Sequence, residues 1–355
     1  MLIPADRLTR LLTATLERAG AETERAQVCA EHLVEANLKG HDSHGVGMAP
    51  SYVRWIAAGI LQPNARARVI RDHMAVMVVD GQYGLGQPVA RETVDMAIAR
   101  AKQTGIACVA LRNACHIGRI GTYGEQCADA GLVSTHYVNV VGADPAVAPF
   151  GGREPRMLTN PYCCTIPQAN GDHIVLDFAT SAIAIGKLRV AHMKGEPAPA
   201  GVLLDAEGAP TTDTGTFFTS GPRGFLLPFG LHKGGGMQII CELLGGALAG
   251  QWTMQPGSNR DLGAAVNNML SIVIDPDAFG GREAYEAEAA AMIDYIRDTA
   301  PGEGNDRVRM PGDPERESRA RRLKDGVPID DNTWADLMRA AASVGLDAAG
   351  VAAIG

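Results

Sequence analysis

Residues 74–86 read Met-Ala-Val-Met-Val-Val-Asp-Gly-Gln-Tyr-Gly-Leu-Gly, an apolar run that ends among glycines. A short apolar run closed by a turn signal is typical of a buried strand. A Rossmann unit places Gly-x-Gly-x-x-Gly directly after its first strand, but Gly81, Gly84 and Gly86 have the spacing Gly-x-x-Gly-x-Gly. This strand therefore does not begin a dinucleotide-binding unit of the Rossmann type.

A second signal against such a unit lies at residues 162–178. Two extended segments, 162–167 and 173–178, flank Asn170-Gly171-Asp172, a strong tight-turn signal. We expect an antiparallel hairpin here, whereas doubly wound sheets are built from parallel strands. Helical and strand-like segments alternate elsewhere, at residues 89–103, 106–111, 122–130, 132–141 and 266–274. The fold class that we predict is mixed, α/β with α+β character.

Helices are expected at both ends of the chain and at one apolar stretch between them. Residues 6–19 and 21–39 repeat apolar side chains at helical spacing, and charged helices follow residue 276. The stretch 237–248 is nearly apolar, with Glu242 as its single charge, so we expect a buried helix. The glycine-rich loop 230–236 before it could hold an anion at the helix N-terminus, with Lys233 adding a charge; the alternative is a plain glycine hinge.

Composition limits the class of protein. The 355 residues suggest two or three domains, and 46% hydrophobic with 20% charged residues is ordinary for a globular protein. A net charge of −8 argues against nucleic acid as a partner. Seven cysteines without a Cys-x-x-Cys indicate neither a disulfide framework nor a zinc site, and favour the reducing cytoplasm. We see no signal peptide and no apolar stretch of about 18 residues, so we expect no membrane span.

The loop Gly40-His41-Asp42-Ser43-His44-Gly45 follows the second predicted helix. Reactive groups are often found on such loops, because a rigid element positions them. Its two histidines could be a metal pair, a base with its orienting group, or two unrelated surface residues. No cysteine or second carboxylate cluster lies nearby in sequence to complete a metal site, so we expect no metal.

A second candidate loop, residues 113–121, contains His116, Gly118 and Arg119. A guanidinium can hold a carboxylate or phosphate through two parallel bonds, although a lone arginine is more often a solvated surface residue. No Gly-x-Ser-x-Gly is present, which lowers the expectation of a serine hydrolase.

Taken together, several segments resemble the second type of the malate/L-lactate dehydrogenase family, NAD(P)-dependent oxidoreductases without a Rossmann fold. They occur in the family's order over nearly the whole chain: His41-Asp42-Ser43-His44-Gly45, His116-Ile117-Gly118, Thr159-Asn160-Pro161, 176–181 with Gly186-Lys187, His232-Lys233-Gly234 and Pro311-Gly312-Asp313. Residues 43–48, 116–121 and 177–187 are most similar to a hydroxycarboxylate dehydrogenase branch of the family.

The resemblance implies a homodimer, a mainly antiparallel cofactor-binding sheet and helices gathered from both chain ends. We expect three domains on this basis. Residues 1–70 with 285–355 would be a helical domain carrying the catalytic loop, 71–130 with 231–284 a central αβ domain, and 131–230 the domain of the cofactor-binding sheet.

The same resemblance implies reversible reduction of 2-oxo acids by NADH or NADPH. His44 would donate the proton to the carbonyl oxygen, near Asp177, with Ser43 and His116 as the other catalytic candidates. Cofactor contacts are implied at His44, Gly118, Arg119, Ile120, Val175, Leu176, Asp177, Phe178, Ala179, Thr180, Ser181, His232, Lys233, Asn267, Gly312, Asp313, Pro314 and Glu315. A reductase of cyclic imino acids and a nucleotide-binding regulatory protein on the same scaffold are the alternatives.

One position departs from the family pattern. Many members carry an arginine where this chain has Met48, and a thioether cannot bind a substrate carboxylate. Met48 suits instead a bulkier or aromatic 2-oxo acid, because methionine is apolar and adaptable. Met48, Arg119 and Thr159 are the substrate candidates. Arg119 could serve either substrate or cofactor, and Arg54 is a further cation that could hold the carboxylate.

Overall fold

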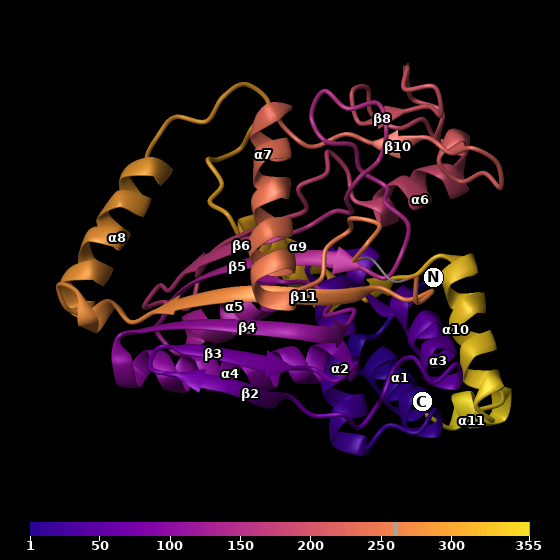
Figure 1. Ribbon diagram of the computed structural model, residues 1–355, viewed down its shortest axis with the longest axis horizontal. Coiled ribbons are helices and arrows are strands. Elements are labelled where there is room, and N and C mark those ends of the chain that lie inside the picture. The colour runs from indigo at the N-terminus through magenta and orange to yellow at the C-terminus, as the bar shows by residue number, and fades with distance from the viewer. Residues whose placement is uncertain (259–260, 355) are drawn as a thin grey trace.

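The computed structural model describes residues 1–258 and 261–354. Its centre is one seven-stranded sheet in the order β2-β3-β4-β11-β5-β6-β7 (Figure 1). The strands are β2 (Arg68–His73), β3 (Val76–Asp80), β4 (Ile106–Cys115), β5 (Val133–Val141), β6 (Tyr162–Ile166), β7 (Ile174–Phe178) and β11 (Val266–Ile274). Among these strands only β3 and β4 pair in parallel. The predicted mainly antiparallel, non-Rossmann sheet is therefore confirmed, including its hairpin at β6 and β7.

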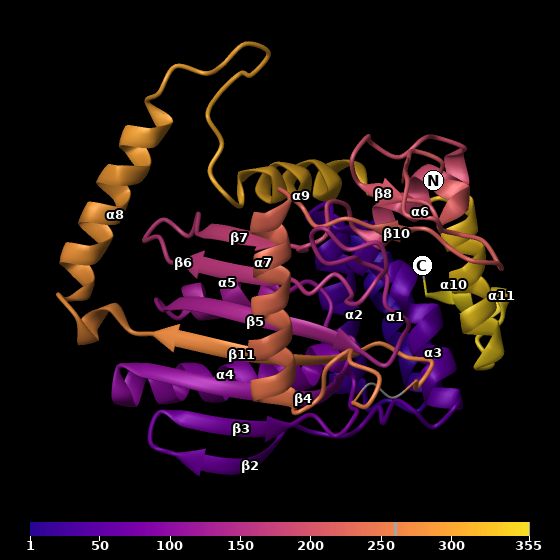
Figure 2. The same ribbon diagram turned by 45° about the horizontal axis from the view of Figure 1, so that its top comes forward.

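Different helices cover the two faces of this sheet. Helices α4 (Gly86–Thr104) and α5 (Gly121–Asp129) lie on one face, and α7 (His232–Cys241) crosses the other and continues into a π-helix, η4 (Glu242–Gly250) (Figure 2). The apolar side chains between α4 and the sheet are fully buried, among them Val89, Val94, Val109 and Leu111. A crossover helix is what a parallel pair such as β3–β4 requires.

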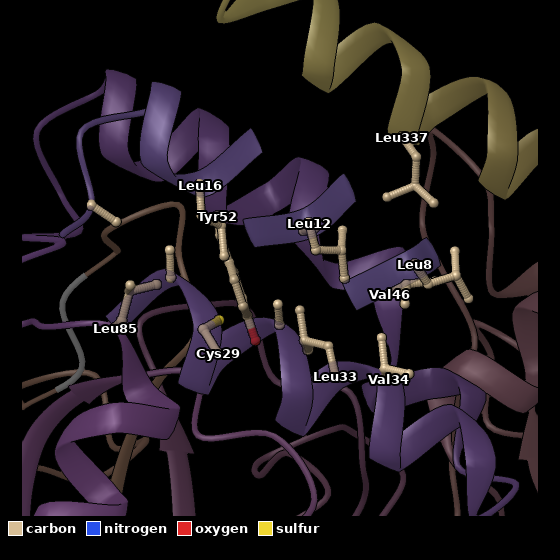
Figure 3. Close-up of a cluster of buried hydrophobic side chains, with 14 of the residues drawn as sticks. Leu8, Leu12, Leu16, Cys29, Leu33, Val34, Val46, Tyr52, Leu85 and Leu337 are labelled. Carbon is tan, nitrogen blue, oxygen red and sulfur yellow. The ribbon is translucent and has the colours of Figure 1, made fainter. Parts of the chain in front are cut away.

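The two chain ends form one helical layer. It contains α1 (Ala5–Arg18), α2 (Thr23–Leu38) and α3 (Ala49–Ala57) together with α9 (Asp313–Asp325), α10 (Asp331–Ser343) and α11 (Ala348–Ala353). Near the N-terminus β1 (Leu2–Ile3) pairs antiparallel with β12 (Val327–Pro328). Figure 3 shows the shared core, in which Leu337 of α10 joins Leu8, Leu12, Leu16, Leu33 and Tyr52. This confirms that helices gather from both ends.

A smaller unit stands over one end of the sheet. It holds α6 (Ile185–Lys194), the 3-10 turn η3 (Thr214–Thr216) and a three-stranded sheet of β8 (Leu203–Leu204), β9 (Pro210–Thr211) and β10 (Phe225–Leu226). The predicted division into three domains stays a prediction. In the structure, strands from 71–130, from 131–230 and from 231–284 pair within the one large sheet.

The expectation of a buried apolar helix at 237–248 is wrong. The helix begins at His232, so Gly234, Gly235 and Gly236 lie within it instead of forming a loop. Its polar side chains face inward: Nε2 of Gln238 donates to the carbonyl of Leu158 at 2.9 Å, and Glu242 accepts from Asn160 at 2.7 Å. The apolar side chains face outward, with exposures of 44% for Ile239, 44% for Ile240, 51% for Leu243 and 63% for Leu248. The side of this helix that is buried is therefore set by the hydrogen bonds of Gln238 and Glu242 and by the glycines that face β5.

Helix α8 (Arg282–Arg297) stands apart from the other helices at the side of the molecule (Figure 2). A short connection with the 3-10 turn η5 (Pro276–Ala278) precedes it, and a longer one leads from it to α9. Ile293 is the one buried residue among those of α8. Met292 and Tyr295 are exposed by 54% and 76%. No helix within residues 1–258 and 261–354 is long and apolar enough to cross a membrane.

Candidate active site

The loop after α2 is held by residues from both ends of the chain. Gly40 has φ +83°, the left-handed conformation that commonly ends a helix and that glycine adopts without strain. Asn37 in the last turn of α2 brackets the loop: its Oδ1 accepts from the backbone N–H of Val46 at 2.7 Å, and its Nδ2 donates to Asp42 at 2.6 Å. Arg322 of α9 also donates to Asp42, at 2.6 and 3.1 Å. The loop is therefore fixed on both sides.

Ser43 and His44 lie in the 3-10 turn η1 (Asp42–His44), which precedes η2 (Val46–Met48). Ser43 Oγ is 2.9 Å from Nδ1 of His44. The first turn of α6 passes so close that a side chain at Gly186 would collide with Cβ of Ser43. Helix α6 thus covers the loop, and the hydrogen bond from Ser43 fixes Nδ1 of the His44 ring.

The rings of His44 and His116 are stacked, with centroids 5.5 Å apart and planes inclined by 18°. Burial lowers the pKa of His44 to about 4, although the charge of Asp177 opposes this shift. Burial, with His44 and His32 nearby, also holds the pKa of His116 well below its usual range. Both imidazoles are therefore uncharged near neutral pH in the free protein, which suits a proton acceptor and a neutral hydrogen-bond donor.

Arg119 does not reach into solvent, so its reading as a solvated surface residue is wrong. Its side chain is 1% exposed, and Nη1 donates to both carboxylate oxygens of Glu125, at 3.1 and 3.0 Å. Its Nε lies 3.6 Å from Asp177, and its backbone N–H donates to Nε2 of His32 at 3.1 Å. Glu125 therefore engages Nη1 of the guanidinium, whereas Nε and Nη2 are buried without a hydrogen-bond partner among the described residues.

Asp177 is the penultimate residue of β7 and caps α5. Its Oδ2 accepts from the backbone N–H of Gly121 at 2.8 Å, where a helix N-terminus favours negative charge. Next along the chain, Thr180 donates its hydroxyl to the carbonyls of Thr159 and Asn160, both at 2.9 Å. The carbonyl of Thr180 accepts from Phe229 at 3.0 Å. The predicted cofactor segment 177–181 therefore runs beside Thr159 and beside the segment that enters α7.

The other cofactor candidates fall into three places. Asn267 accepts from the backbone N–H of Ile117 at 3.0 Å and so supports the loop of Gly118 and Ile120. His232 and Lys233 are exposed at the start of α7, where His232 lies 6.0 Å from the ring of Phe150. A cavity of about 420 Å³ has Val175, Gly312 and Glu315 in its wall, with Lys39, Glu125, His173, Arg316 and Arg319 among its other lining residues.

The remaining predicted residues are less informative. Asp313 accepts from Arg316 at 2.5 Å and from the backbone N–H of Met310 at 2.8 Å. Leu176 and Pro314 are exposed, at positions next to the cavity residues in sequence. Met48 is half-buried against the helical core, and Arg54 is exposed and donates to Ser51 at 2.8 Å. Within the described residues no group of three or more His, Cys, Asp or Glu side chains is arranged to hold a metal ion.

Four residues of this site were missed by sequence reasoning: Tyr52, Gln87, Glu125 and His32. The sequence assigns none of them a role, because polar residues are common in helices. The available signal was a polar side chain at a position that the helical pattern buries, as for Gln87 in the first turn of α4. That signal does not show which residue is the hydrogen-bond partner of the buried polar side chain.

The site can be set beside known proteins. The family model for malate/L-lactate dehydrogenase matches residues 3–338. Hydroxycarboxylate dehydrogenase B of Escherichia coli is 43% identical over 96% of this chain and 94% of its own length. An L-lactate dehydrogenase of Cupriavidus necator is 43% identical over 89% of this chain and 90% of its own. A solved E. coli structure assigned as a malate/lactate dehydrogenase matches with TM-score 0.95 and 41% identity, covering 100% of this chain and 98% of that one.

Proposed function

Because the chain belongs to the malate/L-lactate dehydrogenase family, we propose that it interconverts 2-oxo acids and 2-hydroxy acids with NADH or NADPH. One 2-oxo acid, one NAD(P)H and one proton give one 2-hydroxy acid and one NAD(P)⁺. The nicotinamide, when bound, supplies the hydride that goes to the carbonyl carbon. The observation that carries this proposal is the stacked pair His44 and His116, with Ser43 behind one ring and Asp177 nearby.

His44 is the proton donor in reduction and the acceptor in oxidation. An uncharged imidazole is ready to take the hydroxyl proton of a 2-hydroxy acid, since burial leaves it neutral. For reduction it must first be protonated, and the carboxylate of a bound 2-oxo acid favours the imidazolium as Asp177 does. A positioned acid of this kind contributes roughly 10²–10⁴ in rate.

The residues implied for the cofactor fit an extended anionic dinucleotide. Gly312 at the start of α9 has φ +99°, and a Cβ there would lie 3.1 Å from the carbonyl of His173, so this wall of the cavity requires glycine. The nearby N-terminus of α9 suits an anion, as does that of α7 beside Lys233. The nicotinamide half of the cofactor would be held close to His44 by the loop of Gly118, Arg119 and Ile120, by residues 175–181 and by Asn267.

The substrate side favours a bulky 2-oxo acid. Met48 is half-buried beside the catalytic loop and offers an apolar surface to the substrate side chain. Thr159, whose backbone carbonyl accepts from Thr180, lies next to the segment of Asp177 and would offer its hydroxyl to the substrate. In this proposal Arg119 is one of the cofactor-binding residues: its Nη1 is bonded to Glu125, its Nε faces Asp177, and Nε and Nη2 are buried without a hydrogen-bond partner in the part of the chain that the structure describes.

A substrate scan tests the function. Oxidation of NADH and NADPH is followed by absorbance with aliphatic and aromatic 2-oxo acids and with cyclic imino acids. We expect turnover with 2-oxo acids, faster for bulky ones. Turnover with cyclic imino acids alone would replace the proposal by an imine reductase, and cofactor binding without any turnover would indicate a regulatory protein.

We also propose a homodimer in the cytoplasm. The outward apolar side of α7 and η4, with Ile239, Ile240 and Leu243, is a surface that a second copy would cover. Helix α8 buries little against its own chain, and a helix of this kind is normally stabilised by packing. All seven cysteines are unpaired, which suits a reducing compartment.

A further inference from the structure

A buried chain of hydrogen bonds ends on the ring of His116. The hydroxyl of Tyr52 lies 2.7 Å from Nδ1 of His116, and Nε2 of Gln87 donates to the same hydroxyl at 2.7 Å. Behind them the thiol of Cys29 donates to Oε1 of Gln87 at 3.3 Å. Cys29, Tyr52 and Gln87 are all 0% exposed. Three helices, α2, α3 and α4, supply this chain, and Figure 3 shows the Tyr52 hydroxyl beside the Cys29 sulfur.

The direction of each bond follows from which atoms carry hydrogen. An amide nitrogen can only donate, so the Tyr52 oxygen accepts from Gln87. Its single hydrogen goes to Nδ1 of His116 at 2.7 Å in preference to the backbone carbonyl of His116, which lies 3.5 Å away. Burial raises the pKa values of the Tyr52 phenol and the Cys29 thiol, so both keep their protons. Cys29 in turn fixes the orientation of the Gln87 amide. Nδ1 of His116 is therefore an acceptor.

A neutral imidazole whose Nδ1 accepts must carry its hydrogen on Nε2. We infer that Tyr52 and Gln87 are positioning residues, which hold His116 in the Nε2–H form so that it donates a hydrogen bond to the carboxylate of the 2-oxo acid. This inference rests on the proposed function for the identity of the acceptor. The tautomer of His116 itself depends only on the buried chain of hydrogen bonds, and not on the proposed function.

The arrangement answers how a carboxylate is held without an arginine at position 48. The carbonyl oxygen and one carboxylate oxygen of a 2-oxo acid lie side by side. Ser43 and Tyr52 tie the Nδ1 atoms of the two stacked rings, which leaves the Nε2 edges of His44 and His116 for the substrate. His44 then serves the carbonyl oxygen, which changes charge in the reaction, and His116 serves the carboxylate, which does not. A fixed neutral donor suits that second task because it neither takes nor gives up a proton.

The first test observes the tautomer directly. Nitrogen-15 NMR of the full-length protein labelled at histidine distinguishes a protonated from an unprotonated ring nitrogen, and the signals of His116 are assigned by their loss in His116→Gln. We expect Nε2 protonated and Nδ1 unprotonated between pH 6 and pH 8. An Nδ1–H tautomer or an imidazolium in that range would overturn the inference. No substrate is needed, so this result stands even if the proposed function fails.

The second test breaks the chain of hydrogen bonds by substitution and measures KM for the 2-oxo acid. Tyr52→Phe should give a mixture of His116 tautomers and raise KM for the 2-oxo acid by roughly 2- to 12-fold, as for the loss of one neutral hydrogen bond, with the Kd for NADH unchanged. Gln87→Met should shift both readouts in the same direction. An unchanged tautomer in both variants would refute the positioning role.

Tyr123→Phe is the matched control. Tyr123 is also fully buried, and its hydroxyl donates to the carbonyl of Ile117, next to His116, without touching the imidazole. We expect this variant to lose stability while the tautomer and KM stay as in the unaltered protein. If it changed KM as much as Tyr52→Phe does, the effect would belong to the loop backbone and not to the His116 ring.

Discussion

At the scale of single residues, His44 has two features that a proton-transfer group needs. Ser43 fixes its ring, and burial keeps it uncharged until an anion binds beside it. We expect His44→Ala to fold and still to bind NADH, with kcat for oxo-acid reduction lowered roughly 10²- to 10⁴-fold. Steady-state assays and fluorescence titration measure the two properties. His73→Ala, on the exposed strand β2, is the control, and near-normal turnover of His44→Ala would remove the assignment.

Arg119 is a buried charge with a structural duty. Its removal leaves Glu125 with Lys39, at 2.6 Å, as its remaining cation. Breaking a buried ion pair from one side typically costs about 3–5 kcal/mol, so Arg119→Met should lower the free energy of unfolding by an amount of that order. Denaturant titration checks this. The double variant Arg119→Met with Glu125→Gln should recover part of the loss, and a single variant as stable as the parent protein would contradict our account.

What could be predicted at this scale depended on sequence distance. The His41–His44 loop was found because its groups are neighbours in the chain. The partner of His116 was not found, since Tyr52 lies 64 positions before it, and Gln87, which bonds to Tyr52, lies 35 positions after Tyr52. Arg119 was misjudged for a different reason: Glu125 lies only six positions away, but the burial of the pair depends on packing that residue spacing does not show.

At the scale of elements, the N-terminus of α7 presents an exposed lysine next to free backbone N–H groups. If this end holds a phosphate of the cofactor, Lys233→Ala should raise the Kd for NADH or NADPH by up to roughly 10- to 100-fold, since a charged hydrogen bond contributes about 1.5–3 kcal/mol. Fluorescence titration measures it, with Lys102→Ala at the far end of α4 as the control. An unchanged Kd would leave Lys233 a substrate or surface role.

Helix α7 also shows why an element's existence is easier to predict than its environment. The apolar pattern correctly indicated a helix, but the inward side is chosen by Gln238 and Glu242, which bond to Leu158 and Asn160. Strand β2 was missed for a related reason. All six of its residues are exposed at the edge of the sheet, so it has no apolar alternation to detect.

At the scale of the whole molecule, the proposed dimer can be measured directly. Leu243→Glu places a charge in the middle of the outward apolar side of α7 and η4, where a second copy would bury it. We expect the parent protein to have the mass of a dimer by light scattering and this variant to have that of a monomer. Leu323→Glu, at an exposed leucine of α9, should remain dimeric. A monomeric parent protein would refute the dimer.

Stability should fall in mild acid. Burial lowers the pKa of His136 and His44 to about 4 and of His32 to about 3, and it lowers that of His116 as well. Below about pH 6.5 the unfolded chain binds protons on these rings and the folded chain does not, so the free energy of unfolding decreases as pH falls from about 6.5 to about 4.

Each such histidine contributes up to about 1.4 kcal/mol per pH unit in that range. Denaturant titrations at pH 7 and pH 5 measure the slope. His136 bonds to Ser134 and Ser271 away from the active site, so His136→Gln keeps a polar side chain there but removes one titrating ring, and it should flatten the slope. Equal stability at both pH values would show that these rings are not held neutral.

The position of β11 has a consequence for how the protein is made. This strand lies between β4 and β5 in the sheet although it follows both by more than a hundred positions in the chain. A ribosome therefore releases β4 and β5 with open edges well before the strand that joins them emerges. Exposed edges recruit other strands. The nascent chain should need a chaperone during that interval, and fragments that stop before residue 266 should be found with chaperones or in aggregates.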